Sequence, residues 1–556
     1  MRNTIRFSIV LAVLLCVSSA FAQNTNSGDI RGTALDSTGA VIPGVTVTVK
    51  DVDKDIITTH TTDGAGLFDT GSIVTDHYLI TFEKDGFKEY IRGPVTLEVQ
   101  TLTIDGHLQV GATTETVQVT TDVQLLQTET GSQSTTMAEQ ELKDLPNQGT
   151  PSWENFVVLT PGAAASPTGG GSAADPGQQA SVNGNAVFYN VLGDGTTMSL
   201  PSNGNSYDYN FDSLQEVQMI TSAGSAQYEN GGVLYNQISK GGTSHFHGDL
   251  FEYFQNTALN AASYGFGQLQ TVPITRGNYF GGSFGGPVPF GTFKKKLFFF
   301  FNYNYSQNES PSNGFETVPT QAWMNGDFTG APPVYDPTTQ VVDANGNLHR
   351  QSFACEYYAC DYVNGNKIPS GLMSPVAQAI QKYYPTPNVP NPTVNQGITT
   401  NNVFYNYSVS NPGWSYFYRV DYDITPKNRL TATEFYTYGQ GNELTNDCPI
   451  NCTDAHNTAI TAQISDVWTF SSAMVNEFHA GFSTQNNWYI PATLDKGYPA
   501  KLGIDWNKAD MFPEVNINGT GIWGLSGGTN AIQHQIIGEP TDVMTIIKGK
   551  HILHFG

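Results

Sequence analysis

The chain contains little charge, few basic residues and no long apolar run after its N-terminus. Lys and Arg total 25 against 49 Asp and Glu, so the net charge is −24, and charged residues are only 13% of the chain. Nucleic acid is therefore not an expected partner, because phosphate binding needs a basic surface. Without an apolar run long enough for a spanning helix, any membrane crossing has to be made by strands.

Catalytic motifs are also scarce, with no phosphate loop and no pair of catalytic carboxylates. Residues 281–285 match the G-x-S-x-G nucleophile elbow in letters, but that motif needs a strand-to-helix turn and this one falls in a strand-like run. His245, His247 and Asp249 share one strand face, which suits a metal or simply lines a lumen. We expect no metal, no cofactor and no enzymatic activity.

Asp51, Asp53 and Asp55 begin like a calcium-binding loop. Ile56 then occupies the position that needs glycine, and Thr62 the position that needs a bidentate acid. We therefore expect a solvated turn here.

The first 22 residues have the pattern of a secretory signal peptide. Arg2 and Arg6 precede an apolar run over residues 7–17, and Ala20-Phe21-Ala22 follows as a small-x-small cleavage site. We expect cleavage after Ala22 and an exported protein.

Cysteines are few, and four of the five form two close pairs in polar stretches. In an exported chain such pairs predict local disulfides, and one four-cysteine zinc site is the alternative. The predicted disulfide residues are Cys355, Cys360, Cys448 and Cys452.

Aromatic residues make up 12% of the chain, which also has 57 Gly, so a mainly β fold is expected. In residues 28–110, short alternating runs such as Val45-x-Val47-x-Val49 are separated by Gly and Pro turns, which predicts a small β-sandwich. The motif from Gly32 to Val47, with IPGV at its centre, resembles the carboxypeptidase regulatory-like domain. This resemblance implies a transthyretin-like sandwich and no peptidase activity.

Residues 111–136 form a Thr- and Gln-rich linker with one β-prone segment. Such a segment can add to the sheet edge of another protein, although a purely structural strand remains the alternative. The segment consists of Glu115, Thr116, Val117, Gln118, Val119 and Thr120. Residues 137–243 then mix two short helical pieces with short Gly-punctuated strands, which predicts a small α+β domain.

From residue 244 to 556 the pattern is strand after strand. Residues 414–424 place tyrosines and Ile424 on one face and Arg419, Asp421 and Asp423 on the other, which is inverted for a packed sandwich. Residues 294–306, KKKLFFFFNYNYS, put Phe299, Phe301, Tyr303 and Tyr305 on one face. Both patterns are typical of a membrane barrel with an apolar outside and a polar lumen.

The connections support this interpretation. Short turns at residues 425–428, 471–474 and 548–550 alternate with long polar stretches such as residues 307–401. Outer-membrane barrels have short turns at one rim and long loops at the other.

Residues 213–256 and several further motifs resemble TonB-dependent receptors of the Oar-like type. The further motifs, in family order, lie at residues 145–162, 182–195, 276–288, 294–303, 419–430 and 469–483. The resemblance implies a periplasmic N-terminal domain, a plug over residues 137–243 and a barrel of about 22 strands. It also implies three partners, the TonB energising complex, outer-membrane lipid and a nutrient, and it places the TonB-box-like segment at Glu115 to Thr120.

Residues 244–556 hold only about nine or ten recognisable strands, fewer than the family barrel needs. We therefore expect a fragment that lacks the C-terminal part of its barrel. The expected function is uptake of a siderophore, oligosaccharide or peptide across the outer membrane. The alternative is a surface binding or adhesion protein with a carbohydrate site in the sandwich, but the spacing of Phe68, Tyr78, Phe82, Phe87 and Tyr90 favours core packing over a sugar platform.

Overall fold

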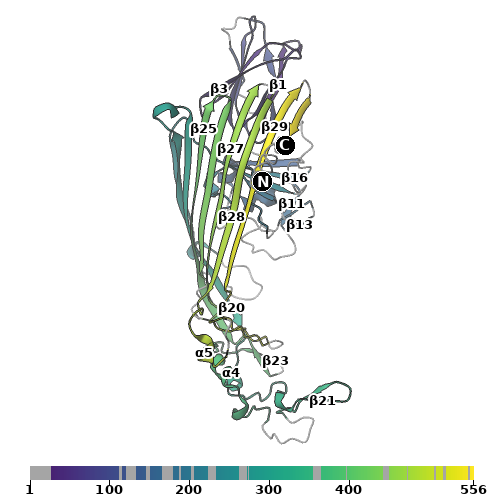
Figure 1. The fold of residues 1–556 in the computed structure, drawn as a ribbon, viewed down its shortest axis with the longest axis vertical. Helices are drawn as coiled ribbons and strands as arrows, with labels where there is room; N and C mark the ends of the chain where they lie inside the picture. Colours follow the sequence, from purple (N-terminus) through teal and green to yellow (C-terminus); the bar gives the residue numbers. More distant parts are fainter. Residues whose placement is uncertain are drawn as a thin grey trace, which may run out of the picture.

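A sandwich, a small mixed unit and a sheet of long strands make up the computed structural model of the protein (Figure 1). The sandwich lies at one end of the long strands, and the long connecting loops lie at the other. The residues described are 27–111, 116–119, 133–145, 151–165, 180–183, 185–186, 190–201, 206–222, 233–261, 272, 275–354, 365–395, 397–442, 450–471, 474–505, 509–517, 521–548 and 551–556. The expected signal peptide and Glu115, Thr120, Cys355, Cys360 and Cys448 lie outside these residues.

Two small sheets form the N-terminal sandwich. One has the order β4-β1-β7 with β8 also on β1, and the other the order β3-β2-β5-β6-β9. Alternate residues of β1, β2 and β5 point into the shared core, as the period of two requires. The strands are β1 (Ser27–Asp36), β2 (Thr46–Asp51), β3 (Ile56–Thr61), β4 (Leu67–Val74), β5 (Asp76–Glu83), β6 (Glu89–Leu97), β7 (Thr101–Thr103), β8 (Gly106–Leu108) and β9 (Thr116–Val119).

A five-stranded sheet in the order β10-β16-β17-β14-β15 forms the unit that we call the plug. Both expected helical pieces are present, the second as a 3-10 helix. Its elements are β10 (Gln133–Ala138), α2 (Glu139–Asp144), η1 (Trp153–Leu159), β11 (Ala163–Ala165), β12 (Ala180–Val182), β13 (Asn185–Ala186), β14 (Asn190–Gly193), β15 (Thr196–Thr197), η2 (Phe211–Ser213), β16 (Leu214–Ser222) and β17 (Leu234–Ser239).

Among the described residues, nine strands form one antiparallel sheet in which each strand pairs with the next along the chain. This number agrees with the nine or ten expected. The strands are β18 (His247–Asn256), β19 (Arg276–Pro287), β20 (Leu297–Glu316), β25 (Val403–Thr425), β26 (Asn428–Asn442), β27 (Thr453–Ser471), β28 (Met474–Pro491), β29 (Ala531–Lys548) and β30 (His551–Phe555). The predicted short turn at residues 425–428 is confirmed, because it joins β25 to β26. The other two predicted turns, at residues 471–474 and 548–550, fall partly outside the described residues.

One expected boundary was wrong. Residues 307–316 were assigned to a long polar loop, but β20 continues to Glu316 and pairs with β25 along this whole length. Backbone hydrogen bonds hold a ladder together without an apolar face, so polar composition did not reveal this extension.

The predicted strand faces are confirmed. Phe301 and Tyr303 are 43% and 40% exposed, whereas Phe300 and Asn302 are fully or almost fully buried. On β25, every second residue from Ser415 to Asp423 is buried, and these inward side chains include the charged ones.

The plug and the inner face of the sheet share one hydrophobic core. Phe300, Phe417 and Phe435 of the long strands pack with plug residues such as Trp153 and Tyr235. None of the helices in the described part of the chain has both the length and the apolar character needed to cross a membrane.

The loops at the far end pack into a core of their own, around Tyr498, Leu502 and Phe512. Tyr383 reaches this core from the connection between β20 and β25, and its ring lies 5.2 Å from that of Phe512. The remaining elements are η3 (Thr257–Leu259), η4 (Gly291–Phe293), α3 (Gln321–Met324), η5 (Pro337–Thr339), β21 (Val341–Val342), β22 (Leu348–His349), η6 (Ser370–Leu372), α4 (Pro375–Ile380), η7 (Gln381–Tyr383), β23 (Thr393–Asn395), β24 (Ile398–Thr400) and α5 (Tyr498–Leu502).

Candidate functional site: the plug and its contacts

A buried arginine joins the sheet to the plug. Arg419 points inward from β25, and its Nε lies 3.0 Å from a carboxylate oxygen of Asp421. Its Nη1 donates to the carbonyl oxygen of Ser239, at the end of β17, at 2.9 Å. The Ser239 amide in turn donates to Asp194, and burial raises the pKa of that plug carboxyl. The guanidinium therefore satisfies a sheet carboxylate and a plug carbonyl at once.

Asn210 makes a second polar contact with the sheet, just before η2. Its Nδ2 donates to Asn302 Oδ1 of β20 at 2.7 Å, and its Oδ1 accepts from the Ser415 hydroxyl at 2.5 Å. The neighbouring Tyr209 ring packs against Phe417 and Phe435, with centroids 5.0 and 5.6 Å away. Both strand residues that bond Asn210 had been assigned from sequence to the inward faces.

β15 makes a third contact, with β27 and β28. The Thr196 hydroxyl donates to Gln463 at 3.0 Å, and Ser483 donates to the Thr197 carbonyl at 2.8 Å. The plug is therefore anchored through the edge strand β15 of its sheet as well as through the end of β17 and Asn210.

Two glycines let the chain pass from the plug to the first long strand. A Cβ added to Gly242 would lie 2.4 Å from the Phe299 carbonyl oxygen, and one on Gly241 would lie 3.0 Å from an Asp421 oxygen. Side chains are excluded here, because the backbone runs against β20 and the arginine contact.

The N-terminal sandwich also touches the plug. The Val99 backbone amide donates to Glu216 Oε1 at 3.2 Å, and the side-chain Nε2 of Gln218 donates to the Val99 carbonyl oxygen at 2.7 Å. Burial, and after it the charge of nearby Glu98, raise the pKa of Glu216 to about 8. Glu216 therefore holds a proton at neutral pH and faces the sandwich as a neutral group.

The free energy of unfolding should depend on pH through Glu216. Its folded pKa of about 8 lies above the ordinary value of 4.5, so its contribution is complete below pH 4.5 and is lost as the pH rises towards 8. We expect stability, measured by urea unfolding in detergent micelles, to fall more steeply from pH 5 to 8 in the wild type than in Glu216→Gln. Gln keeps an acceptor for the Val99 amide but does not titrate, so equal slopes would contradict this assignment.

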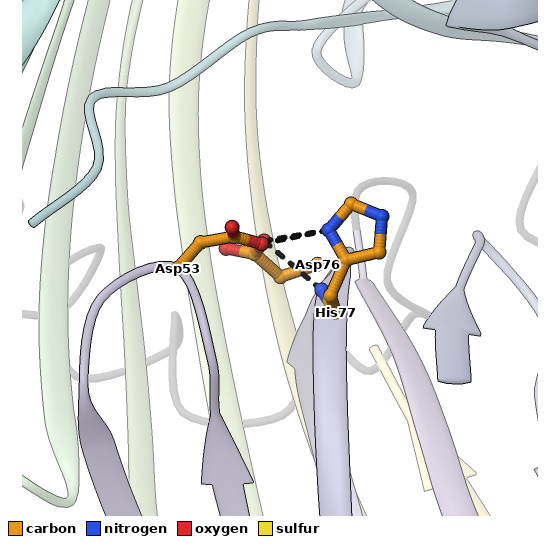
Figure 2. Close-up of side chains that lie close together, drawn as sticks. All are labelled: Asp53, Asp76 and His77. Atoms are coloured by element: carbon orange, nitrogen blue, oxygen red, sulfur yellow. Dashed lines mark hydrogen bonds and ion pairs between the residues drawn. The ribbon is translucent and has the colours of Figure 1, made fainter. Parts of the chain in front are cut away.

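A charged cluster lies at the turn between β2 and β3, where the sandwich meets the long strands (Figure 2). His77 Nδ1 lies 2.7 Å from Asp53 Oδ2, and Lys54 forms a buried ion pair with Asp76. The hydrogen bond with His77 lowers the pKa of Asp53, whereas burial raises that of Asp76 to about 6. The Ser244 amide donates to the Asp53 carbonyl at 2.7 Å, which connects this turn to the start of the large sheet.

The expectation of a solvated turn was only partly right. Asp55 is exposed, but Asp51 is 3% exposed and accepts a hydrogen bond from the Lys54 amide at 2.8 Å. Asp51 continues the alternation of Val47 and Val49 along β2, so its side chain lies on the buried face of that strand.

Within the described residues, Asp53, Asp76 and His77 place three possible metal ligands within 4.8 Å of one another. The Lys54 ammonium already neutralises Asp76, so the donor set does not favour a cation.

His245 and His247 are exposed, and Asp249 accepts from the Ser283 hydroxyl. Because Ser283 lies in the middle of β19, residues 281–285 form no nucleophile elbow.

The structure places the predicted TonB-box-like residues only in part. Thr116 to Val119 form β9 on the sandwich, and the remaining two residues, Glu115 and Thr120, are outside the described residues.

Cys452 is disulfide-bonded, but the other three cysteines of the predicted disulfides are outside the described residues, so the pairing remains a prediction. Lys54, Tyr209 and Asn210 were not singled out from sequence, because their partners are distant in the chain.

Comparisons with known proteins agree with this architecture. Residues 29–109 match the carboxypeptidase regulatory-like domain, and residues 238–556 match the outer membrane beta barrel domain. The TonB-dependent transporter Oar of Myxococcus xanthus is 26% identical over 311 residues, 52% of this chain and 28% of Oar.

Two solved structures align at low identity. A mutant of the ferric enterobactin receptor PfeA from Pseudomonas aeruginosa is 11% identical, with a TM-score of 0.38 over 74% of this chain and 46% of the receptor. The outer membrane transporter YddB from Escherichia coli is 10% identical, with a TM-score of 0.42 over 74% of this chain and 44% of YddB. The chain spans less than half the length of each of these three relatives.

The barrel match covers more than half of the chain, and the regulatory-like domain precedes it. The chain therefore belongs to the outer membrane beta barrel domain family, with the domain order of an Oar-like TonB-dependent transporter.

Proposed function

We propose that the protein takes up a bulky nutrient across the outer membrane, driven by TonB acting on the segment around β9. The observation that carries this proposal is the plug, which is anchored to the inner face of β25 through Arg419 and Asn210. A plug held by hydrogen bonds and one shared core closes a lumen until force is applied. β9 precedes it in the chain, where a pull would be transmitted to β10.

The nutrient is a siderophore, an oligosaccharide or a peptide, and it docks on the packed outer loops before it enters. Those loops have a hydrophobic core around Phe512, so they present a pre-formed surface. The assignment to a family of barrel transporters also agrees with the expectation that the chain is not an enzyme.

The carbohydrate-binding alternative loses support in the sandwich. Of the five aromatic residues that a sugar platform could use, Phe68, Tyr78, Phe82 and Tyr90 are at most 7% exposed, and Phe87 packs against the same core. Sugar binding by stacking needs exposed rings, so these residues cannot provide it.

Deletion of residues 115–120 tests the proposal. We expect cells that produce the deletion variant to bind their ligand at the surface as the wild type does, but to lose at least 90% of uptake. The probes are a labelled ferric siderophore, an oligosaccharide and a peptide, each with and without a protonophore. Deletion of the five residues 343–347, the turn between β21 and β22, controls for shortening of the chain, because this turn lies outside the loop core around Phe512. Unchanged, protonophore-insensitive uptake in the deletion variant would contradict the proposal.

A further inference from the structure

The TonB-box-like segment is docked on the N-terminal sandwich. β9 pairs in parallel with β6, with Tyr90 opposite Val117 and Arg92 opposite Val119. β9 is thereby the edge strand of the sheet β3-β2-β5-β6-β9. Only one edge of β9 is used by this pairing.

The side chains of β9 fit this docked position. Val117 and Val119 are partly buried and pack against the sandwich core, whereas Gln118 between them is exposed. The alternation that made this segment β-prone in sequence therefore matches the two sides of the sheet edge.

The chain just before β9 is held on the same edge. The Lys88 amide donates to the Gln109 carbonyl at 2.8 Å, and the Gly111 amide donates to the Gly86 carbonyl at 3.1 Å. Val110 between them is 76% exposed, so backbone bonds and not apolar burial fix this part. Together these contacts hold residues 109–111 against the sandwich, shortly before β9 in the chain.

This docking limits access to the segment. A partner strand that adds by backbone pairing recognises a segment through its edges and through pockets for alternate side chains. In the docked state β6 occupies one edge, and the sandwich covers both valines. Among the described residues the pairing covers four positions and is parallel, the less stable arrangement, so the segment can detach without unfolding the sandwich.

We infer that the sandwich is a latch: its β6 edge holds the TonB-box-like segment, and β9 has to leave β6 before a TonB strand can take that edge and contact Val117 and Val119. The inference rests on the proposed function, which makes this segment the point of TonB engagement. It gives the regulatory-like domain a role in controlling when the plug is coupled to TonB.

A reversible cross-link tests the latch in the full-length protein. Ile91 and Gln118 are opposite one another, and neither belongs to the sandwich core, so Ile91→Cys with Gln118→Cys should form a disulfide on mild oxidation. Thr59→Cys with Gln118→Cys is the matched control, because Thr59 is exposed on β3, at the far edge of the same sheet. Peptide mass analysis without reductant detects the bond.

Binding to the purified periplasmic domain of TonB is then measured for each protein. We expect the oxidised Ile91–Gln118 variant to bind at least tenfold more weakly than the wild type, and reductant to restore binding. Wild-type protein with and without reductant controls for the other cysteines. If the oxidised Ile91–Gln118 variant bound TonB as tightly as the wild type, or if the disulfide failed to form, the latch would be overturned. If the wild type also fails to bind TonB, the proposed function itself fails, whether or not the disulfide forms.

Discussion

Replacement of Arg419 with Met should lower the free energy of unfolding by about 3–5 kcal/mol, because it leaves the buried Asp421 carboxylate without the cation that contacts it. The Asp421 side chain is 0% exposed, and the Ser239 carbonyl loses its donor as well. Urea unfolding in detergent micelles gives the energy. Limited proteolysis of the plug then shows whether its attachment has loosened.

Two further variants make this test specific. Arg276→Met removes a charge whose side chain is 62% exposed and lies 3.6 Å from Glu309, and it should cost less than about 1 kcal/mol. Asp421→Asn in the Arg419→Met background should restore part of the loss, since no uncompensated charge remains. If Arg419→Met lowered the free energy of unfolding no more than Arg276→Met does, the role assigned to the contacts of Arg419 would be contradicted.

Replacement of Trp153 with Ala should lower the free energy of unfolding by about 3–5 kcal/mol, because it opens a cavity in the core that the plug shares with the sheet. Trp153 is 1% exposed, and its ring lies 5.1 Å from Tyr235. Thermal unfolding followed by near-ultraviolet circular dichroism reports the loss of packing in the plug.

Trp153→Phe is the matched control. The indole nitrogen of Trp153 has no hydrogen-bond partner among the described residues, so Phe removes no bond and keeps most of the apolar volume. We expect Trp153→Phe to lower the free energy of unfolding by less than about 1.5 kcal/mol. If Phe were as damaging as Ala, the cavity explanation would be wrong.

Arg419 and Trp153 hold the same plug in place by different kinds of interaction. Arg419 fixes the end of β17 by charge and hydrogen bonds, and Trp153 fills the apolar core behind it. The proposed function requires a plug that is stable at rest but can be displaced. Polar contacts such as those of Asn210 can be exchanged for water during movement, whereas the apolar core resists it.

Local patterns were enough to predict much of the fold. The alternation in residues 414–424 correctly placed Arg419 and Asp421 on the buried face, and the short turn at residues 425–428 was predicted from its residues alone. These features depend on the period of a strand and on turn chemistry, which act over a few residues. The same reasoning placed Phe301 and Tyr303 on the exposed face.

Most strands, their inward and outward faces and the family resemblance follow from the sequence alone, because neighbouring residues encode each of them. Which groups meet follows from the three-dimensional packing alone: Arg419 with Ser239, Asn210 with Asn302, Glu216 with Val99, and β9 with β6. Those pairs lie far apart in the chain or depend on how one domain docks on another. Burial and pairing at such contacts arise from the packing of whole units, which no local pattern specifies.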